Sequence, residues 1–129
     1  MLLFIIVLLS YRFYVQQQIK KESAELIQNG GISELKEINV DGDKHYILVE
    51  EKDKEKPYCL FLHGGPGSPF PYGVSARSLY PEITENCIAV YYDQRGSGKS
   101  FNKELDIKTM NLPQFTEDAN IIVDYIREH

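Results

Sequence analysis

The residues of this chain that could do chemistry form two short phrases, each directly after an apolar run. The first is residues 63–67, His-Gly-Gly-Pro-Gly, which follow the apolar run 58–62. A short apolar run indicates a buried strand, and the glycines and proline end it. Glycine lets the backbone turn sharply and bring its N–H groups close to a ligand. The phrase indicates either a loop that binds through backbone N–H groups or a plain tight turn, since Gly-Pro pairs are common in turns.

The second phrase is residues 93–98, Asp-Gln-Arg-Gly-Ser-Gly, which follow the apolar run 87–92. Its continuation, Gly98-Lys99-Ser100, matches the end of a nucleotide-binding P-loop. That motif requires a glycine at position 93, where the chain carries Asp93, and a carboxylate there would repel phosphate. We therefore predict that the chain binds no nucleotide.

Together the two phrases resemble those of the proline-iminopeptidase-like branch of the α/β-hydrolases, from about Gly31 to residue 129. In that fold the loop after the third strand supplies a backbone donor to the oxyanion hole. The resemblance implies that the N–H of Gly65, or alternatively that of Gly64, stabilises an acyl oxyanion. It implies a serine hydrolase that acts by acyl transfer on peptide, amide or ester bonds and needs no cofactor.

The resemblance also implies supporting roles for the residues beside these donors. His63 would order the loop by hydrogen bonding, because the catalytic histidine of this fold follows the nucleophile in the chain. Pro66 would hold a cis Gly65–Pro66 bond, since X–Pro is the linkage where a cis bond costs least. Gly67 would support the same loop.

In the second phrase the implied roles are structural, with the wall of the site as a secondary consequence. By the resemblance, Asp93 and Arg95 would form an internal ion pair. Gly96 and Gly98 would take strained backbone angles.

No nucleophile is recognisable in the sequence. A nucleophile elbow requires G-x-S-x-G between a strand and a helix. Ser33, Ser75 and Ser100 each have a glycine two residues before them but none two residues after. The resemblance places the nucleophile, its acidic partner and the catalytic histidine after residue 129. We therefore expect this chain alone to be inactive.

Composition excludes some other functions. The chain has 129 residues and a net charge of −5, with no basic patch, which argues against nucleic-acid binding. Neither Cys59 nor Cys87 has a second ligand at metal-binding spacing, so no zinc or other metal site is predicted. Both cysteines are interpreted as buried, reduced thiols, with a disulfide as the alternative.

The N-terminus is apolar and indicates a membrane anchor. Residues 1–9 are almost wholly apolar, and Tyr11, Phe13 and Tyr14 extend the stretch toward Lys20 and Lys21. A spanning helix needs about 20 apolar residues, so this one is short. Aromatic residues followed by lysines are typical of a membrane interface. A cleaved signal or a buried helix is the alternative, and the side of the membrane stays open.

The remaining pattern predicts an α/β fold. Asp41-Gly42 predicts a hairpin between strands at about 34–40 and 44–49. Strands at 58–62 and 87–92 follow, with a short helix at about 75–80 between them. The last helix starts after Asn111, for which Gln114 would complete a capping box. We expect the N-terminal part of an α/β-hydrolase sheet: an antiparallel hairpin, then parallel strands with helices.

We divide the chain into an anchor or signal-like helix at 1–21, a spacer at 22–31 and an incomplete hydrolase domain at 32–129. The strand order of this fold leaves Tyr58 to Leu62 as an open apolar edge, which favours self-association. The predicted partners are therefore membrane lipid and a second copy of the chain. The alternative function is a non-catalytic truncated product or interaction module built on the half-sheet.

Overall fold

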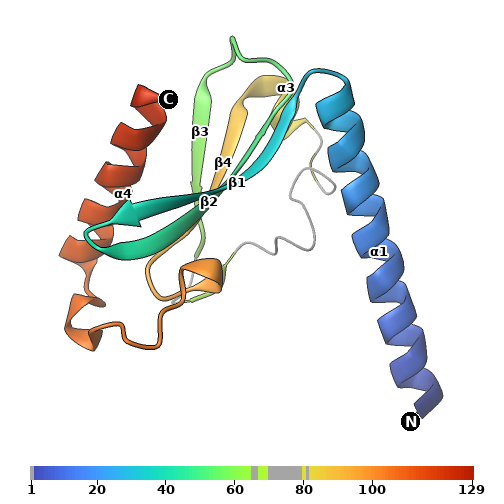
Figure 1. The fold of residues 1–129 in the computed structure, drawn as a ribbon, viewed down its shortest axis with the longest axis horizontal. Coiled ribbons are helices and arrows are strands. Elements are labelled where there is room, and N and C mark those ends of the chain that lie inside the picture. The colour runs from blue at the N-terminus through green and yellow to red at the C-terminus, as the bar shows by residue number, and fades with distance from the viewer. Residues whose placement is uncertain (1, 65–66, 70–79, 81) are drawn as a thin grey trace.

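The computed structural model describes residues 2–64, 67–69, 80 and 82–129, and it shows a small sheet between two long helices (Figure 1). The N-terminal helix α1 spans Leu2–Gln28 and the C-terminal helix α4 spans Leu112–Glu128. Between them lie the strands β1 (Ile32–Val40), β2 (Asp43–Glu51), β3 (Tyr58–Leu62) and β4 (Ile88–Asp93). Short helical turns complete the described chain: α3 (Ile83–Asn86), η1 (Gly98–Ser100) and η2 (Ile107–Thr109).

The hairpin predicted at Asp41-Gly42 is confirmed. Both residues have positive φ, 51° and 90°, as a tight two-residue hairpin turn requires. Asn39 Oδ1 accepts a hydrogen bond from the Gly42 N–H at 2.9 Å and so supports the turn. The flanking strands pair in antiparallel register from Val40 with Asp43 to Ile32 with Glu51, a little longer than predicted.

The four strands form one mixed sheet in the order β1-β2-β4-β3, which confirms the predicted fold class. β2 pairs with β4 in antiparallel fashion, and β3 pairs with β4 in parallel. Because β3 and β4 run in the same direction, both finish at one end of the sheet, beside His63 and Gln94. We call this the carboxyl end and the opposite one the amino end. Among the described strands β3 is an edge, as predicted.

Helix α4 covers one face of the sheet through a compact apolar core. Alternate residues of the strands point to this face because side chains of a strand alternate in direction. Ile122 of α4 is fully buried against them. The fully packed members are Ile38, Val40, Ile47, Val90, Tyr92 and Ile122.

Two local predictions need correction and one lies outside the described residues. β4 begins at Ile88 rather than residue 87 and ends at Asp93, preceded by the short helix α3. Asn111 does cap α4, accepting from the Gln114 N–H at 3.0 Å. The capping box is wrong, because the Gln114 side chain donates to Asp118 at 3.0 Å instead of returning to Asn111. The helix predicted at 75–80 falls mostly outside the described part of the chain.

Helix α1 is continuous across the predicted boundary between anchor and spacer. It is long and apolar enough to cross a membrane. Its C-terminal part packs on the sheet, where Leu26 is buried and Gly31 lies directly against it. Gly31 has no side chain that would separate the helix from the sheet.

Cys59 and Cys87 are free thiols and form no disulfide with each other. Cys87 is buried and Cys59 is partly buried. Burial, together with the neighbouring Cys59, raises the pKa of the Cys87 thiol to about 11, so it stays protonated at neutral pH.

The exposed ends of β3 give a test of the predicted self-association. Tyr58 is 49% and Leu62 52% exposed. Charged residues on an edge strand oppose pairing with another chain. We expect the detergent-solubilised chain to sediment as oligomers and the double variant Tyr58→Lys, Leu62→Lys to sediment as monomers. The same change at Leu35, on the opposite edge strand β1, should leave the oligomers intact. A monomeric parent chain would contradict the prediction.

Candidate functional site

The candidate site begins where β3 and β4 end side by side. His63 follows β3, and Gln94 follows β4. The Gln94 side-chain amide donates to the carbonyl of His63 at 2.7 Å, and the Gln94 backbone N–H points to His63 Nε2 at 3.2 Å. These contacts join the starts of the two predicted loops, so the position of one loop fixes that of the other.

Ser97 completes this junction. Its hydroxyl lies 2.7 Å from His63 Nε2 and 2.6 Å from the carbonyl of Gln94. A hydroxyl has one proton, so it donates to one of these groups at a time. A serine beside a histidine could in principle be an activated nucleophile. Ser97 is only 4% exposed and its hydroxyl lies within hydrogen-bond distance of groups on both sides, so it is not open to a substrate.

The loop after β4 folds around its own carboxylate. Asp93 Oδ2 accepts from the backbone N–H of Lys99 at 2.7 Å, and its carbonyl accepts from the Ser100 hydroxyl at 2.6 Å. Gly96 and Gly98 have positive φ, 73° and 50°, which confirms the strained angles predicted for them. A side chain on Gly98 would overlap the Asp93 carboxylate. The backbone N–H of Lys99, at the position where a P-loop would bind phosphate, is thus bound to the Asp93 carboxylate.

Arg95 has different partners from the predicted one. The prediction of an Asp93–Arg95 ion pair was wrong: Arg95 forms a bidentate pair with Asp118 of α4, with both N–O distances 2.7 Å. It also donates to Asp43 at the start of β2 at 2.5 Å. The Arg95 and Asp118 side chains are 3% and 1% exposed. Hydrogen bonding to Asp118, despite burial, raises the pKa of Arg95.

The sequence analysis did not identify Asp118 as part of the site, although its position on the last helix could have indicated it. It lies on α4 four residues before Ile122, on the helix face that packs against the sheet. A carboxylate on such a face needs a buried cation, because an unpaired buried charge is costly. Arg95, which the resemblance had paired with Asp93, is the cation that meets this need.

A second buried polar pair lies beside this network. His45 of β2 is fully buried, and its Nδ1 lies 2.6 Å from the hydroxyl of Tyr92 on β4. Burial lowers the pKa of His45 and raises that of Tyr92, so both are neutral at pH 7. His45 is therefore a core residue and not a base available to a substrate.

The predicted oxyanion donor lies outside the described residues. Gly65 and Pro66, with the predicted cis bond between them, are not among the residues that the structure describes. Gly64 and Gly67 flank them and are exposed, and Gly67 has a φ of 75°. A side-chain carbon at Gly64 would meet no atom of the described residues within 4 Å, its chain neighbours aside. The donor roles of Gly65 and Gly64 remain predictions.

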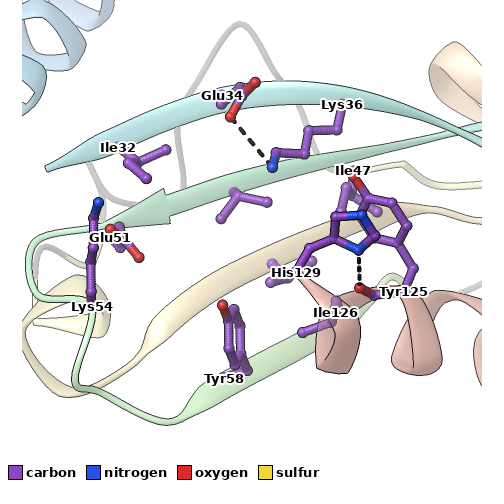
Figure 2. A pocket seen from close by; sticks show the side chains of 12 residues that line it. Ile32, Glu34, Lys36, Ile47, Glu51, Lys54, Tyr58, Tyr125, Ile126 and His129 are labelled. Carbon is purple, nitrogen blue, oxygen red and sulfur yellow. Dashed lines mark hydrogen bonds and ion pairs between the residues drawn. The ribbon is translucent and has the colours of Figure 1, made fainter.

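A groove of about 310 Å³ lies at the opposite, amino end of the sheet (Figure 2). Ile47 and Val90 form part of its apolar floor, and Tyr125 and His129 at the end of α4 border it. His129 is held by the carbonyl of Tyr125 at 3.1 Å. None of the predicted site residues that the structure describes lines the groove. Among the described residues no cluster of histidine, cysteine and carboxylate side chains could hold a metal ion.

Comparison with known proteins gives one informative similarity. The probable aminopeptidase YbaC of Bacillus subtilis (strain 168) is 32% identical over 98 residues, which are 76% of this chain and 30% of that protein. This chain thus spans less than a third of the relative's length. No protein-family model matches the chain. The similarity supports a peptidase-like or hydrolase-like function and no finer assignment.

The buried ion pair gives a stability test with a matched control. Asp118→Asn removes one charge and leaves Arg95 underpaired in a buried position, which should lower the free energy of unfolding by about 3–5 kcal/mol. Asp124→Asn breaks a pair with Arg127 whose side chains are 69% and 74% exposed, and should change it by less than about 1 kcal/mol. Urea unfolding of the detergent-solubilised chain measures both. Equal effects would show that the pair does not hold α4 on the sheet.

His45 gives a test of pH dependence. Burial first, and Arg95 second, lower its pKa, whereas Asp118, Asp43 and Asp41 act in the opposite direction. The unfolded chain then binds a proton at higher pH than the folded chain, so stability is complete above pH 6.5 and falls below it. The loss should reach at most about 1.4 kcal/mol per pH unit for this group.

Unfolding by urea at several pH values between about 5.5 and 7.5, followed by near-ultraviolet circular dichroism, measures this slope. His45→Gln should flatten it, whereas the exposed His129→Gln should not. A slope that His45→Gln leaves unchanged would assign the pH dependence to other groups.

Proposed function

We propose that this chain is the N-terminal portion of a membrane-anchored serine hydrolase of the proline-iminopeptidase-like branch, and that it supplies the oxyanion loop. The reaction would be acyl transfer from peptide, amide or ester bonds. The observation that carries the proposal is the junction of His63 with Gln94 and Ser97 at the carboxyl end of the sheet. The partial similarity to a probable aminopeptidase supports the hydrolase class.

The junction suits a loop that must hold backbone donors in place. Donors aimed at a developing oxyanion are effective because they are ordered before the reaction begins. His63 is bound through its ring and its carbonyl, so the first residue of the 63–67 loop is fixed on β3 and β4. Within this proposal His63 positions the loop, and the Gly65 N–H, with Gly64 as the alternative, binds the oxyanion. The nucleophile, base and acid would come from residues outside this chain.

Membrane anchoring forms part of the proposal. Every residue of α1 from Leu2 to Tyr14 is exposed, including large apolar side chains such as Phe4 and Leu8. Such a surface is unfavourable in water and favourable in a bilayer. We propose that α1 anchors the domain in a membrane.

A non-catalytic interaction module is the second candidate. The observation that favours it is the edge position of the apolar strand β3 among the described strands, since an edge strand can pair with another chain. Activity in the setting of a complete hydrolase distinguishes the two candidates.

The test is a chimera in which the matched 98-residue segment replaces the corresponding part of the Bacillus relative. The proposal predicts that this chimera hydrolyses aminoacyl-amide or ester reporters, while the chain alone gives only the buffer rate. Gly65→Pro removes the predicted donor N–H and should lower kcat on the order of 10²–10³-fold. Gly64→Pro tests the alternative donor in the same way.

Lys54→Ala, a change in the exposed turn before β3, serves as the control and should keep full activity. A folded but inactive chimera would favour the interaction module. Full activity in both glycine variants would remove the oxyanion role of the loop.

A further inference from the structure

Helix α1 has a fixed direction relative to the sheet. Near its C-terminus Leu26 lies against Gly31, which also meets the carbonyl of Glu51 at the amino end of the sheet. Further back, Ile19 and Ser23 share a surface pocket with Lys99, which follows β4 at the carboxyl end. The helix therefore runs along the sheet from the carboxyl end to the amino end (Figure 1).

The N-terminal part of α1 consequently extends beyond the carboxyl end. Residues 2–18 precede the part that reaches the sheet, a length of about 25 Å at 1.5 Å per residue. Partial burial begins at Val15, and the thirteen residues from Leu2 to Tyr14 are exposed. The apolar helix thus projects beyond the end at which β3 and β4 finish (Figure 1). His63, Gln94 and Ser97 follow these strands, so they lie at the same end.

The segment 99–112 adds a second apolar surface at this end. It follows β4, and Asn102 is bound to Asp43 at the start of β2 at 3.1 Å, which keeps it near the hairpin turn. Three of its apolar side chains are largely exposed: Phe101 at 62%, Ile107 at 84% and Leu112 at 78%. Lys103 and Lys108 lie between them, and neither forms an ion pair within the described part of the chain.

We infer that the carboxyl end of the sheet faces a phospholipid bilayer, with α1 inserted in it and the 99–112 segment resting in the headgroup region. Exposed apolar side chains with interspersed lysines suit that region, because the lysine amines stay with the headgroups while apolar groups enter about 5–10 Å. Together with the proposed function, this places the junction of His63 on the membrane side, facing amphiphiles that reside in the bilayer.

A bilayer explains both surfaces at once, which a second copy of the chain does not. The two surfaces belong to segments far apart in the sequence but project at one end of the molecule (Figure 1). A partner that is apolar over the length of the helix and polar at its surface matches a projecting apolar helix beside a shallow segment with exposed apolar side chains and charges of both signs, including Glu104 and Asp106.

Tryptophan fluorescence tests the inference directly, because the chain has no tryptophan. Three single replacements act as probes: Phe4→Trp in the projecting helix, Phe101→Trp at the carboxyl end and Tyr58→Trp at the amino end. The full chain is reconstituted in phosphatidylcholine vesicles that contain lipids brominated at shallow or deep positions. Iodide quenching reports exposure to water.

The inference predicts deep quenching for Phe4→Trp and shallow quenching for Phe101→Trp. The latter should exceed that of Tyr58→Trp on the order of twofold or more, since interfacial contact buries side chains about 5–10 Å. Adding Ile107→Asp to the Phe101→Trp probe should reduce its quenching by lipid. The matched change Ile27→Asp, at a 54% exposed site near the amino end, should not.

Equal quenching of the Phe101→Trp and Tyr58→Trp probes, with Phe4→Trp deeply quenched, would overturn the inference and leave the anchor intact. Absence of quenching of Phe4→Trp would overturn the anchor and the inference together. Neither result depends on hydrolysis, so an inactive chimera and a failed membrane orientation are separate outcomes.

Discussion

The arrangement of this chain depends on one buried ion pair. Arg95 leaves the end of β4 and forms two hydrogen bonds with Asp118 of α4 and a third with Asp43 of the hairpin. Three separate elements therefore share one guanidinium. Its planar set of donors can serve two carboxylates in fixed directions, which a lysine amine could not do as specifically. A buried pair of this kind contributes little net stability compared with apolar packing, but removing one partner is costly.

This ion pair positions the candidate site indirectly, through the turn that contains Arg95. Gln94 and Ser97 lie on either side of Arg95 in the same turn, and both bind His63. When Arg95 is fixed on α4, the turn is fixed, and the first residue of the 63–67 loop is fixed with it. The Asp93 carboxylate accepts a hydrogen bond from the backbone N–H of Lys99 and so stabilises the turn from inside. Each charged residue of the turn thus has a separate structural task.

Periodicity and turn chemistry were sufficient to predict most of the fold. The hairpin at Asp41-Gly42 and the cap of α4 by Asn111 are local features, and local residues determine them. The edge position of β3 was instead predicted from the strand order that the resemblance implies. The partner of Arg95 is not a local feature. Asp93 is near it in the sequence and Asp118 is near it in space, and only the packing of α4 on the sheet distinguishes them. The contact of the Gln114 side chain with Asp118 joins residues four apart on α4, but Asp118 is held in this place by Arg95, which is distant in sequence.

The direction of α1 relative to the sheet depends on packing, so it could not be predicted from composition. An apolar N-terminus indicates an anchor but not which part of the domain it brings to the membrane. Close contact between Leu26 and Gly31 at one end, and the proximity of Ile19 to Lys99 at the other, set that direction. Because α1 is one uninterrupted helix from Leu2 to Gln28, its exposed apolar part and the part that packs on the sheet share one axis. The same helix that carries the apolar surface therefore determines which end of the sheet lies beside it.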